Sequence, residues 1–300
     1  MATIRDSKQL PQDTISLRSW LTLALLSIIW GSSYILIKKG VEVYSPVQVA
    51  GMRLAISAFA FLPFLIPIWK KINWSKWHFL LIVGLTGTGI PSFMFPLAQT
   101  QISSSIAGIL NSLTPLFTLI LGVLIFRTSF TQSKLVGVLI GLLGAFLLIS
   151  LGNRFGAEGN PWYSLFIVIG CLCYATSGNT VGVYLRDMDS VSISAVSFIM
   201  VGIPAFFFLL STNFTDTLFH HPKGWEALGY VALLALASTV FASILFFKLI
   251  QDTNPLFSST VSYLVPAVAV IWGFIDGEAI TEAHFIGMVL ILVGVYLSRK

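Results

Sequence analysis

Charged side chains are scarce in this chain of 300 residues, since Asp, Glu, Lys and Arg together make up only 10% of it. A soluble domain carries about a quarter charged residues, and so few charges cannot cover the surface of one this size. Hydrophobic residues reach 56%, and the mean hydropathy is +0.90. These values exclude a soluble enzyme, a disordered protein and a nucleic-acid-binding module. They predict an all-α integral membrane protein.

Cysteine and the common cofactor motifs are also missing or nearly so. Cys171 and Cys173, the only two cysteines, lie two residues apart in one apolar run, so a helix would point them in different directions and away from a disulfide. The adjacent His220 and His221 are expected in a solvated loop rather than at a metal. The chain contains no GxxxxGK[ST] loop, which excludes direct coupling to ATP in this chain. We therefore expect no cofactor and no metal site.

Long apolar segments dominate what is present. Ten of them can cross a hydrocarbon core of ~30 Å, which takes about 17–25 helical residues. They are predicted at Trp20–Ile37, Pro46–Trp69, Trp77–Ala98, Ser105–Phe126, Ser133–Leu151, Trp162–Leu185, Val191–Leu210, Trp225–Ile250, Leu256–Ile275 and Ala283–Ser298. The longest loop between them, Ser211 to Gly224, has 14 residues. Most connections are so short that consecutive helices should be antiparallel neighbours.

The positions of lysine and arginine predict the orientation in the membrane. With residues 1–19 as a cytoplasmic tail, eleven basic residues lie on the cytoplasmic side and four on the outer side. Both termini are therefore predicted to be cytoplasmic.

The chain contains an internal repeat. One spacing of leucine, proline and glycine occurs twice, apart from one extra residue in a turn, in Leu113, Pro115, Gly122, Gly137, Gly144 and Leu147 and in Leu264, Pro266, Gly273, Gly287, Gly294 and Leu297. The match predicts two five-helix units, 20–151 and 162–298, and five spans are an odd number, so the second unit inserts upside down. Inverted repeats are the usual construction of secondary transporters, with the substrate near the midplane. A chance match of a few glycines and prolines is the alternative.

Short motifs near the segment ends carry a family resemblance. They are Trp30-Gly-Ser-Ser-Tyr34 with Lys38, Ser45-Pro46 with Gly51-Met-Arg53-Leu, and the stretch from Pro266 through Gly277-Glu278 to Ile286-Gly287-Met288. Over about residues 20–298 the chain resembles two units of the EamA family of the drug/metabolite transporter superfamily. The resemblance implies a bacterial-type inner-membrane exporter or facilitator of small metabolites, often amino acids. Arg127 stands where the family usually has the glutamate matched by Glu278, whose expected role is to cap a helix end.

Charges within the membrane are costly and indicate function. All twelve acidic residues fall in termini, loops or segment ends, so we expect neither a carboxylate relay for protons or sodium nor a site for hydrophobic cations. Two cations remain inside. Arg53 lies ~10 Å below the start of its segment at 1.5 Å per residue, and Lys248 lies near the cytoplasmic end of the eighth. Both are candidates to bind an anionic group of the substrate. Helix capping or snorkelling by Arg53, and snorkelling by Lys248, are the alternatives.

Uncharged polar side chains at mid-segment complete the candidate site. They are Ser33, Tyr34, Asn111, Asn179, Ser262 and Tyr263, with Trp30 as a core or wall residue. Interhelical hydrogen bonding is the alternative explanation for each polar residue. Pro115 and Pro266, at matching positions of the repeat, should bend two helices that line one cavity.

The sequence thus predicts a secondary transporter rather than an enzyme. By alternating access, its two halves would move a zwitterionic, anionic or neutral polar small molecule, with amino-acid export favoured over broader metabolite or nucleotide-sugar transport. An enzyme is disfavoured because no nucleophile–base pair or metal cluster lies at depth, and the repeat argues against a channel. The partners expected are the lipid bilayer and the substrate, not nucleic acid, and the oligomeric state is left open.

Overall fold

The structure is a computed structural model that describes residues 16–126 and 160–298, together with 136–137, 139–141, 143–144 and residue 147. Within these residues it contains helices and connections but no strand. Most of the predicted fifth segment, Ser133–Leu151, lies outside the described residues. So do Arg127 and residues 1–15 of the predicted tail.

Eight helical segments of the described part are long and apolar enough to cross a membrane. They comprise α1 (Leu17–Val41), α2 (Pro46–Ile68), α3 (Trp77–Gly84) with η3 (Leu85–Gly89) and α4 (Ile90–Ala98), α5 (Ser104–Leu110) with η4 (Asn111–Leu113) and α6 (Thr114–Leu124), α8 (Ser164–Tyr184), α9 (Ser190–Leu210), α11 (Gly224–Leu233) with η7 (Leu234–Phe241) and α12 (Ala242–Asp252), and α13 (Pro255–Ser259) with η8 (Thr260–Tyr263) and α14 (Val265–Ile275). Each corresponds to a predicted segment. The last helix, α15 (Glu282–Ser298), has a shorter apolar stretch, His284–Gly294. The chain is thus a helical membrane protein, while ten spans remain a prediction.

Polar side chains fix where several of these helices begin. Ser45 forms a capping box at the start of α2, because its hydroxyl accepts from the Gln48 N–H and its own N–H donates to Gln48 Oε1. The second helix of the other unit also begins at a polar side-chain cap, although without the return bond of a capping box: the Asp189 carboxylate accepts from the Ser192 N–H at 2.9 Å. Hydrocarbon offers no partner to a free N–H at a helix end, so polar caps place these ends at the edge of the membrane.

Four spans change their helical geometry near mid-length, in two matching pairs. One pair contains π-helical stretches: η3 lies between α3 and α4, and η7 between α11 and α12. The other pair contains 3-10 stretches: η4 lies between α5 and α6, and η8 between α13 and α14. Pro115 and Pro266 each fall in the first turn of the α-helix after a 3-10 stretch, where a missing N–H costs least. The bends expected at these prolines therefore coincide with the change of helix type.

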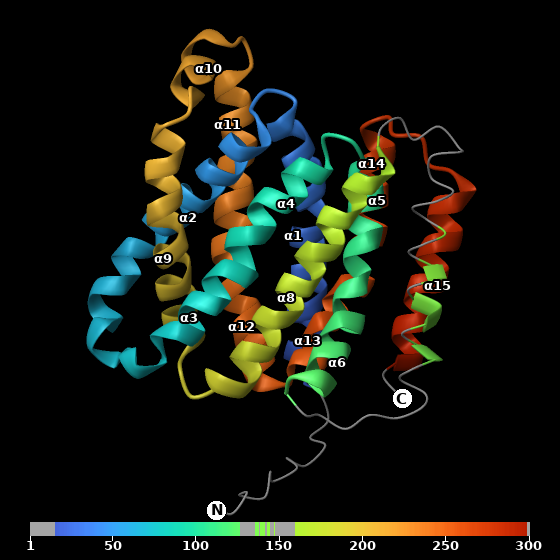
Figure 1. The fold of residues 1–300 in the computed structure, drawn as a ribbon, viewed down its shortest axis with the longest axis horizontal. Helices are drawn as coiled ribbons and strands as arrows, with labels where there is room; N and C mark the ends of the chain where they lie inside the picture. The colour runs from blue at the N-terminus through green and yellow to red at the C-terminus, as the bar shows by residue number, and fades with distance from the viewer. Residues whose placement is uncertain are drawn as a thin grey trace, which may run out of the picture.

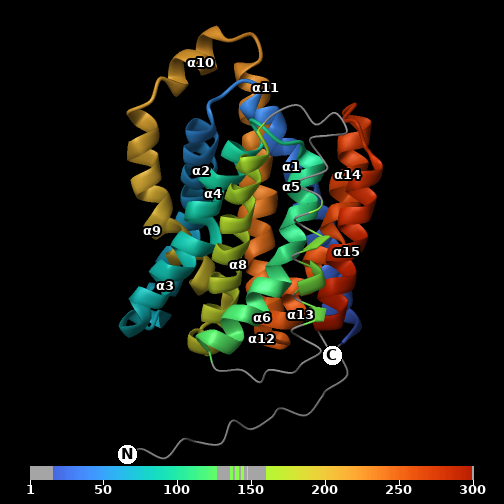
Figure 2. The ribbon, with the colours of Figure 1, turned by 45° about the vertical axis from the view of Figure 1, so that its right-hand side comes forward.

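The two units interlock with opposite orientations (Figures 1 and 2). Helix α1 runs from the lower to the upper end of the bundle in Figure 1, whereas α8, the first helix of the second unit, runs from the upper end to the lower. Helix α1 packs against α12 and α14 of the other unit, and α8 packs against α4 and α6. The second helices, α2 and α9, pack against each other. In the repeat, α1 corresponds to α8, α4 to α12, α6 to α14 and α2 to α9. Each of these contacts therefore has its counterpart when the two units are exchanged, which supports the predicted inverted repeat.

Glycine allows the closest of these approaches. A Cβ at Gly202 of α9 would lie 2.5 Å from the backbone oxygen of Leu54 and 2.5 Å from the Cβ of Ala58, both on α2. Small residues at helix crossings let two backbones meet at this distance in a membrane. The contact helps to hold the two units together where α2 and α9 pack against each other.

Candidate functional site

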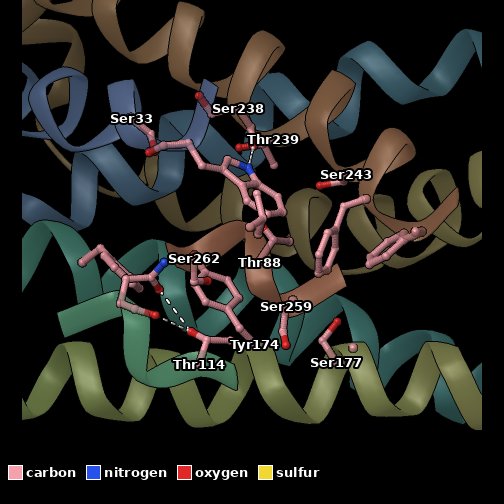
Figure 3. A pocket seen from close by; sticks show the side chains of 18 of the residues that line it. Ser33, Thr88, Thr114, Tyr174, Ser177, Ser238, Thr239, Ser243, Ser259 and Ser262 are labelled. Atoms are coloured by element: carbon pink, nitrogen blue, oxygen red, sulfur yellow. Dashed lines mark hydrogen bonds between the residues drawn. The ribbon is translucent and has the colours of Figure 1, made fainter. Parts of the chain in front are cut away.

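A cavity lies at the centre of the bundle, between the two units. It contains about 920 Å³ of space unoccupied by protein atoms, part of which is continuous with solvent. Hydroxyl groups form much of its polar wall, and Figure 3 shows them facing one another from several helices: Ser33, Thr88, Thr114, Ser177, Ser238, Thr239, Ser243, Ser259 and Ser262.

The wall uses equivalent positions of the two units. Trp30, Ser33 and Tyr34 of α1 have the same spacing as the lining residues Tyr174, Ser177 and Gly178 of α8. The π-helical stretches contribute Gly87-Thr88 from η3 and Ser238-Thr239 from η7, and the 3-10 stretches contribute Asn111 and Ser262. Because π-helical and 3-10 turns change the register of a helix, they direct side chains from mid-span into the space between the units.

Arg53 is the charged residue of this wall, and it has no equivalent in the other unit. Its side chain is only 7% exposed, and its Nε donates to the hydroxyl of Thr239 at 2.8 Å. Tyr174 makes a further side-chain hydrogen bond with the guanidinium. The position that corresponds to Arg53 in α9, eight residues after the helix cap, is Ser197. The cavity is therefore lined by equivalent positions of the two units, but only the first unit contributes a charge among the described lining residues.

Arg53 has no carboxylate partner among the described residues. Of those that line the cavity, none is Asp, Glu, His or Lys, and the ion pairs of the described part all involve other residues. A guanidinium keeps its proton in proteins, and a buried charge without a counter-ion is costly. An anionic group entering the cavity would relieve that cost.

Five further candidate residues line the cavity beside Arg53. Trp30 donates its indole N–H to the carbonyl of Ser238 at 2.9 Å, and the amide oxygen of Asn111 accepts from the Thr114 hydroxyl at 3.3 Å. Ser33, Tyr34 and Ser262 complete the group. Trp30 thus joins the wall of α1 to η7 across the interface between the units.

The structure places the remaining candidates away from the cavity lining. Lys248 is 52% exposed at the side chain, and its Nζ lies 2.6 Å from Asp252 one turn along α12, so it does not join Arg53. Asn179 donates to the carbonyl of Thr118 on α6 and to that of Ala175 in its own helix, each at 3.0 Å. The bond to Thr118 is the interhelical bonding given as its alternative. Tyr263, Pro115 and Pro266 also lie outside the lining. A helix turns by about 100° per residue, so Lys248 and Asn179 point elsewhere although Phe247 and Gly178 line the cavity.

Sequence reasoning missed several residues around Arg53, above all Tyr174 and Thr239. The signal for Tyr174 was available, since Tyr174-x-x-Ser177 repeats the spacing of Trp30-x-x-Ser33. Thr239 lies in a π-helical stretch, which the pattern of apolar residues does not reveal.

A second polar cluster lies at the upper end of the bundle, where α1 ends. The Glu278 carboxylate, 6% exposed, accepts the backbone N–H and the hydroxyl of both Ser104 and Ser105 at 2.6–3.1 Å. Lys38 Nζ lies 3.0 Å from Glu278 and 2.6 Å from Asp276. Glu278 thus caps the start of α5 in the opposite unit.

Electrostatics favours the ionised form of this carboxyl group. Burial by itself would raise the pKa of Glu278, but the hydrogen bonds from Ser105 and Ser104 and the ion pair with Lys38 outweigh burial and lower it. Burial also opposes ionisation of Asp276, whose pKa is lowered by hydrogen bonds from Lys38 and Lys39. Gly277, with φ of +82°, makes the turn between the two acids.

No group of three or more His, Cys, Asp or Glu within the described ranges could hold a metal ion. His220 instead lies 2.9 Å from Asp216 on the surface of α10 (Phe214–His220), a short helix in the long loop.

Comparison with known proteins adds evidence from the whole chain. A sequence model of the EamA-like transporter family matches residues 18–150 and 161–299. An uncharacterized transporter of Archaeoglobus fulgidus is 25% identical, covering 94% of this chain and 98% of the relative. The uncharacterized inner membrane transporter YedA of Escherichia coli K12 is 28% identical, covering 92% and 88% respectively.

Two further similarities bear on function and on fold. A protein of Salmonella typhimurium named as a probable amino-acid metabolite efflux pump is 25% identical, covering 91% of this chain and 92% of its own. A crystal structure with 16% sequence identity has a TM-score of 0.62 and covers 93% of this chain and 96% of that one. At this identity the structural likeness concerns the fold alone.

Proposed function

The chain belongs to the EamA-like transporter family, and from this premise we propose that it exports amino acids or related small polar metabolites across the inner membrane. It acts as a secondary transporter, whose two inverted halves expose the central cavity alternately to each side. Both termini lie in the cytoplasm. Broader metabolite transport, including nucleotide-sugar-like substrates, is the alternative.

One observation carries the proposal: a buried arginine, with no carboxylate partner in the part of the chain that the structure describes, faces a cavity between two inverted units. Secondary transporters place their substrate at this interface, and charges at membrane depth mark the path of substrates and ions. Arg53, Asn111, Ser262, Ser33, Tyr34 and Trp30 are the proposed binding residues. The family and the transporters named among the relatives support transport over catalysis.

Transport can be tested with purified protein in liposomes. Counterflow of amino acids, organic anions and sugars should identify a transported class, and a protein that moves none of them would contradict the proposal.

The site can be tested separately with single cysteines. In a background in which Cys171 and Cys173 are serine, cysteines at Asn111 and Ser262 should react with small aqueous thiol reagents, and substrate should protect both. A cysteine at Lys223, which is exposed in the loop before α11, is the control and should react with or without substrate. If Asn111 and Ser262 both fail to react in a protein that still transports, the substrate binds elsewhere.

A further inference from the structure

We infer that the cavity selects a small organic acid with one net negative charge, and that this charge crosses the membrane without a coupling ion. The membrane potential then drives transport toward the positive side. The inference rests on the proposed function of the cavity as the transport site. It narrows the proposed substrates, because among small polar metabolites it favours acids without an ammonium group over amino acids, and it names the driving force.

The charges of the cavity favour an anion over a zwitterion. Arg53 is the single ionised group among the described lining residues, and the acids of the described ranges lie elsewhere, for example Asp252 beside Lys248 and Glu278 beside Lys38. A carboxylate would meet the guanidinium in a bidentate pair, one of the strong hydrogen-bonded arrangements. The ammonium of an amino acid would find no carboxylate among the described lining residues, and the same guanidinium would repel it.

The rest of the wall suits an apolar or aromatic body. Trp30 packs edge-on against Phe246, with ring centroids 4.9 Å apart, and both line the cavity. Phe95 and Tyr174, at 5.6 Å, form a second aromatic pair of the lining. Such rings accept flat apolar groups, while the surrounding hydroxyls provide hydrogen bonds around the carboxylate.

The described lining residues also offer no carrier for a proton. Apart from Arg53, the titratable side chains among the described lining residues are Tyr34 and Tyr174, and tyrosine normally titrates near pH 10. Neither changes its charge near neutral pH, so a proton would have no group to travel on. A sodium ion would likewise find no carboxylate among the described lining residues. The charge moved per cycle is then that of the substrate.

A membrane potential therefore acts on each transport cycle. Moving one elementary charge through 100 mV corresponds to about 2.3 kcal/mol, which is roughly a 50-fold concentration ratio. In a cell whose interior is negative, an anion is driven outward. This direction follows from the charge of the substrate and does not depend on how the protein is inserted.

The experiment uses four compounds that share one phenyl body in proteoliposomes of the full chain. They are 3-phenylpropanoate (anion), phenylalanine (zwitterion), 3-phenylpropanamide (neutral) and phenethylamine (cation). A potassium gradient with valinomycin imposes the potential, and protein-free liposomes correct for passive leakage. In competition for the transport site, we expect the anion to bind at least about 10-fold more tightly than each of the other three compounds. The loss of one charge-assisted hydrogen bond implies a difference of this size. Its accumulation should rise roughly 50-fold per 100 mV toward the positive side.

Variants link this selectivity to Arg53. Arg53→Gln should abolish the preference for the anion, and Arg53→Lys should retain part of it, because an ammonium cannot form the bidentate pair. Lys248→Gln, which removes an exposed charge outside the cavity, should match the wild type. Competition among the four compounds on the wild-type protein gives the same information if an Arg53 variant does not fold.

Several results would overturn the inference while leaving transport intact. They are equal or tighter binding of phenylalanine, accumulation of the anion that ignores the potential, and stimulation by a proton or sodium gradient. If the protein transports neither these compounds nor any other small metabolite, the proposed function itself is contradicted.

Discussion

Replacing Glu278 by glutamine tests how the two units are joined at the upper end of the bundle. The change keeps the shape of the side chain but removes its charge and replaces one acceptor oxygen by an NH₂ group. Both oxygens of Glu278 are in use, one by Ser104 and Lys38 and the other by Ser105. The amide must therefore leave a backbone N–H at the start of α5 without its acceptor.

The expected cost follows from these contacts. A hydrogen bond to a charged group contributes about 1.5–3 kcal/mol, and a buried N–H that loses its partner costs about 1–3 kcal/mol. Lys38 is 27% exposed at the side chain and keeps Asp276 at 2.6 Å, so the ion pair adds little. We expect the free energy of unfolding to fall by about 2–4 kcal/mol, which lowers the melting temperature by roughly 5–10 °C.

Thermal unfolding of purified protein in detergent, followed by tryptophan fluorescence, would measure the change. Glu226→Gln is a matched control, because Glu226 is exposed and accepts one hydrogen bond from Tyr230. Its effect should stay within about 0.5 kcal/mol. If Glu278→Gln unfolds at the same temperature as this control, the reasoning about the buried carboxylate is refuted.

Three further predictions concern packing, pH and topology. Gly202→Ala should destabilise the protein by about 1–3 kcal/mol, because its Cβ would lie 2.5 Å from the Leu54 oxygen. Gly229→Ala meets nothing within 4 Å and should be neutral or stabilising by up to ~1 kcal/mol; equal melting temperatures for the two variants would contradict this account. Since the pKa values of Asp276 and Glu278 are lowered in the folded protein, their stabilisation should be present above about pH 4 and lost as the pH falls further. The difference in melting temperature between wild type and Glu278→Gln should therefore become smaller as the pH is lowered. A difference that stays constant would contradict the stabilisation by the ionised Glu278 carboxylate. Finally, in cells, a cysteine at Lys223 should react with an impermeant reagent added outside, and a cysteine at Lys71 should not. The reverse result would mean that the chain is inserted in the opposite orientation.

Much of the helical framework could be predicted from sequence because each span depends on its own residues. A run of about 20 apolar residues enters a membrane as a helix whatever its neighbours are. The starts of α2 and α9 were equally local, since Ser45 and Asp189 cap them through the residues three positions further on. The repeat of Pro115 and Pro266 indicated how the two units correspond.

The site was predictable only in part, because a residue's depth can be read from its segment but the direction of its side chain cannot. Arg53 and Lys248 were equally plausible as cations within spans. The rotation of their helices placed Arg53 in the cavity and Lys248 beside Asp252 at the surface. Asn111 and Asn179 were separated in the same way, one into the wall and the other into hydrogen bonds between helices.

The sequence by itself determined the membrane class, the family resemblance and the positions of the eight spans that the described residues contain, since these follow from hydropathy and motifs within short stretches. Tertiary structure alone decided which groups meet. Arg53 and Thr239 are 186 residues apart in the chain, and Lys38 and Glu278 are 240 apart. Such pairs form only when two inverted units pack together, because the contact depends on the rotation and crossing of helices that no local pattern specifies.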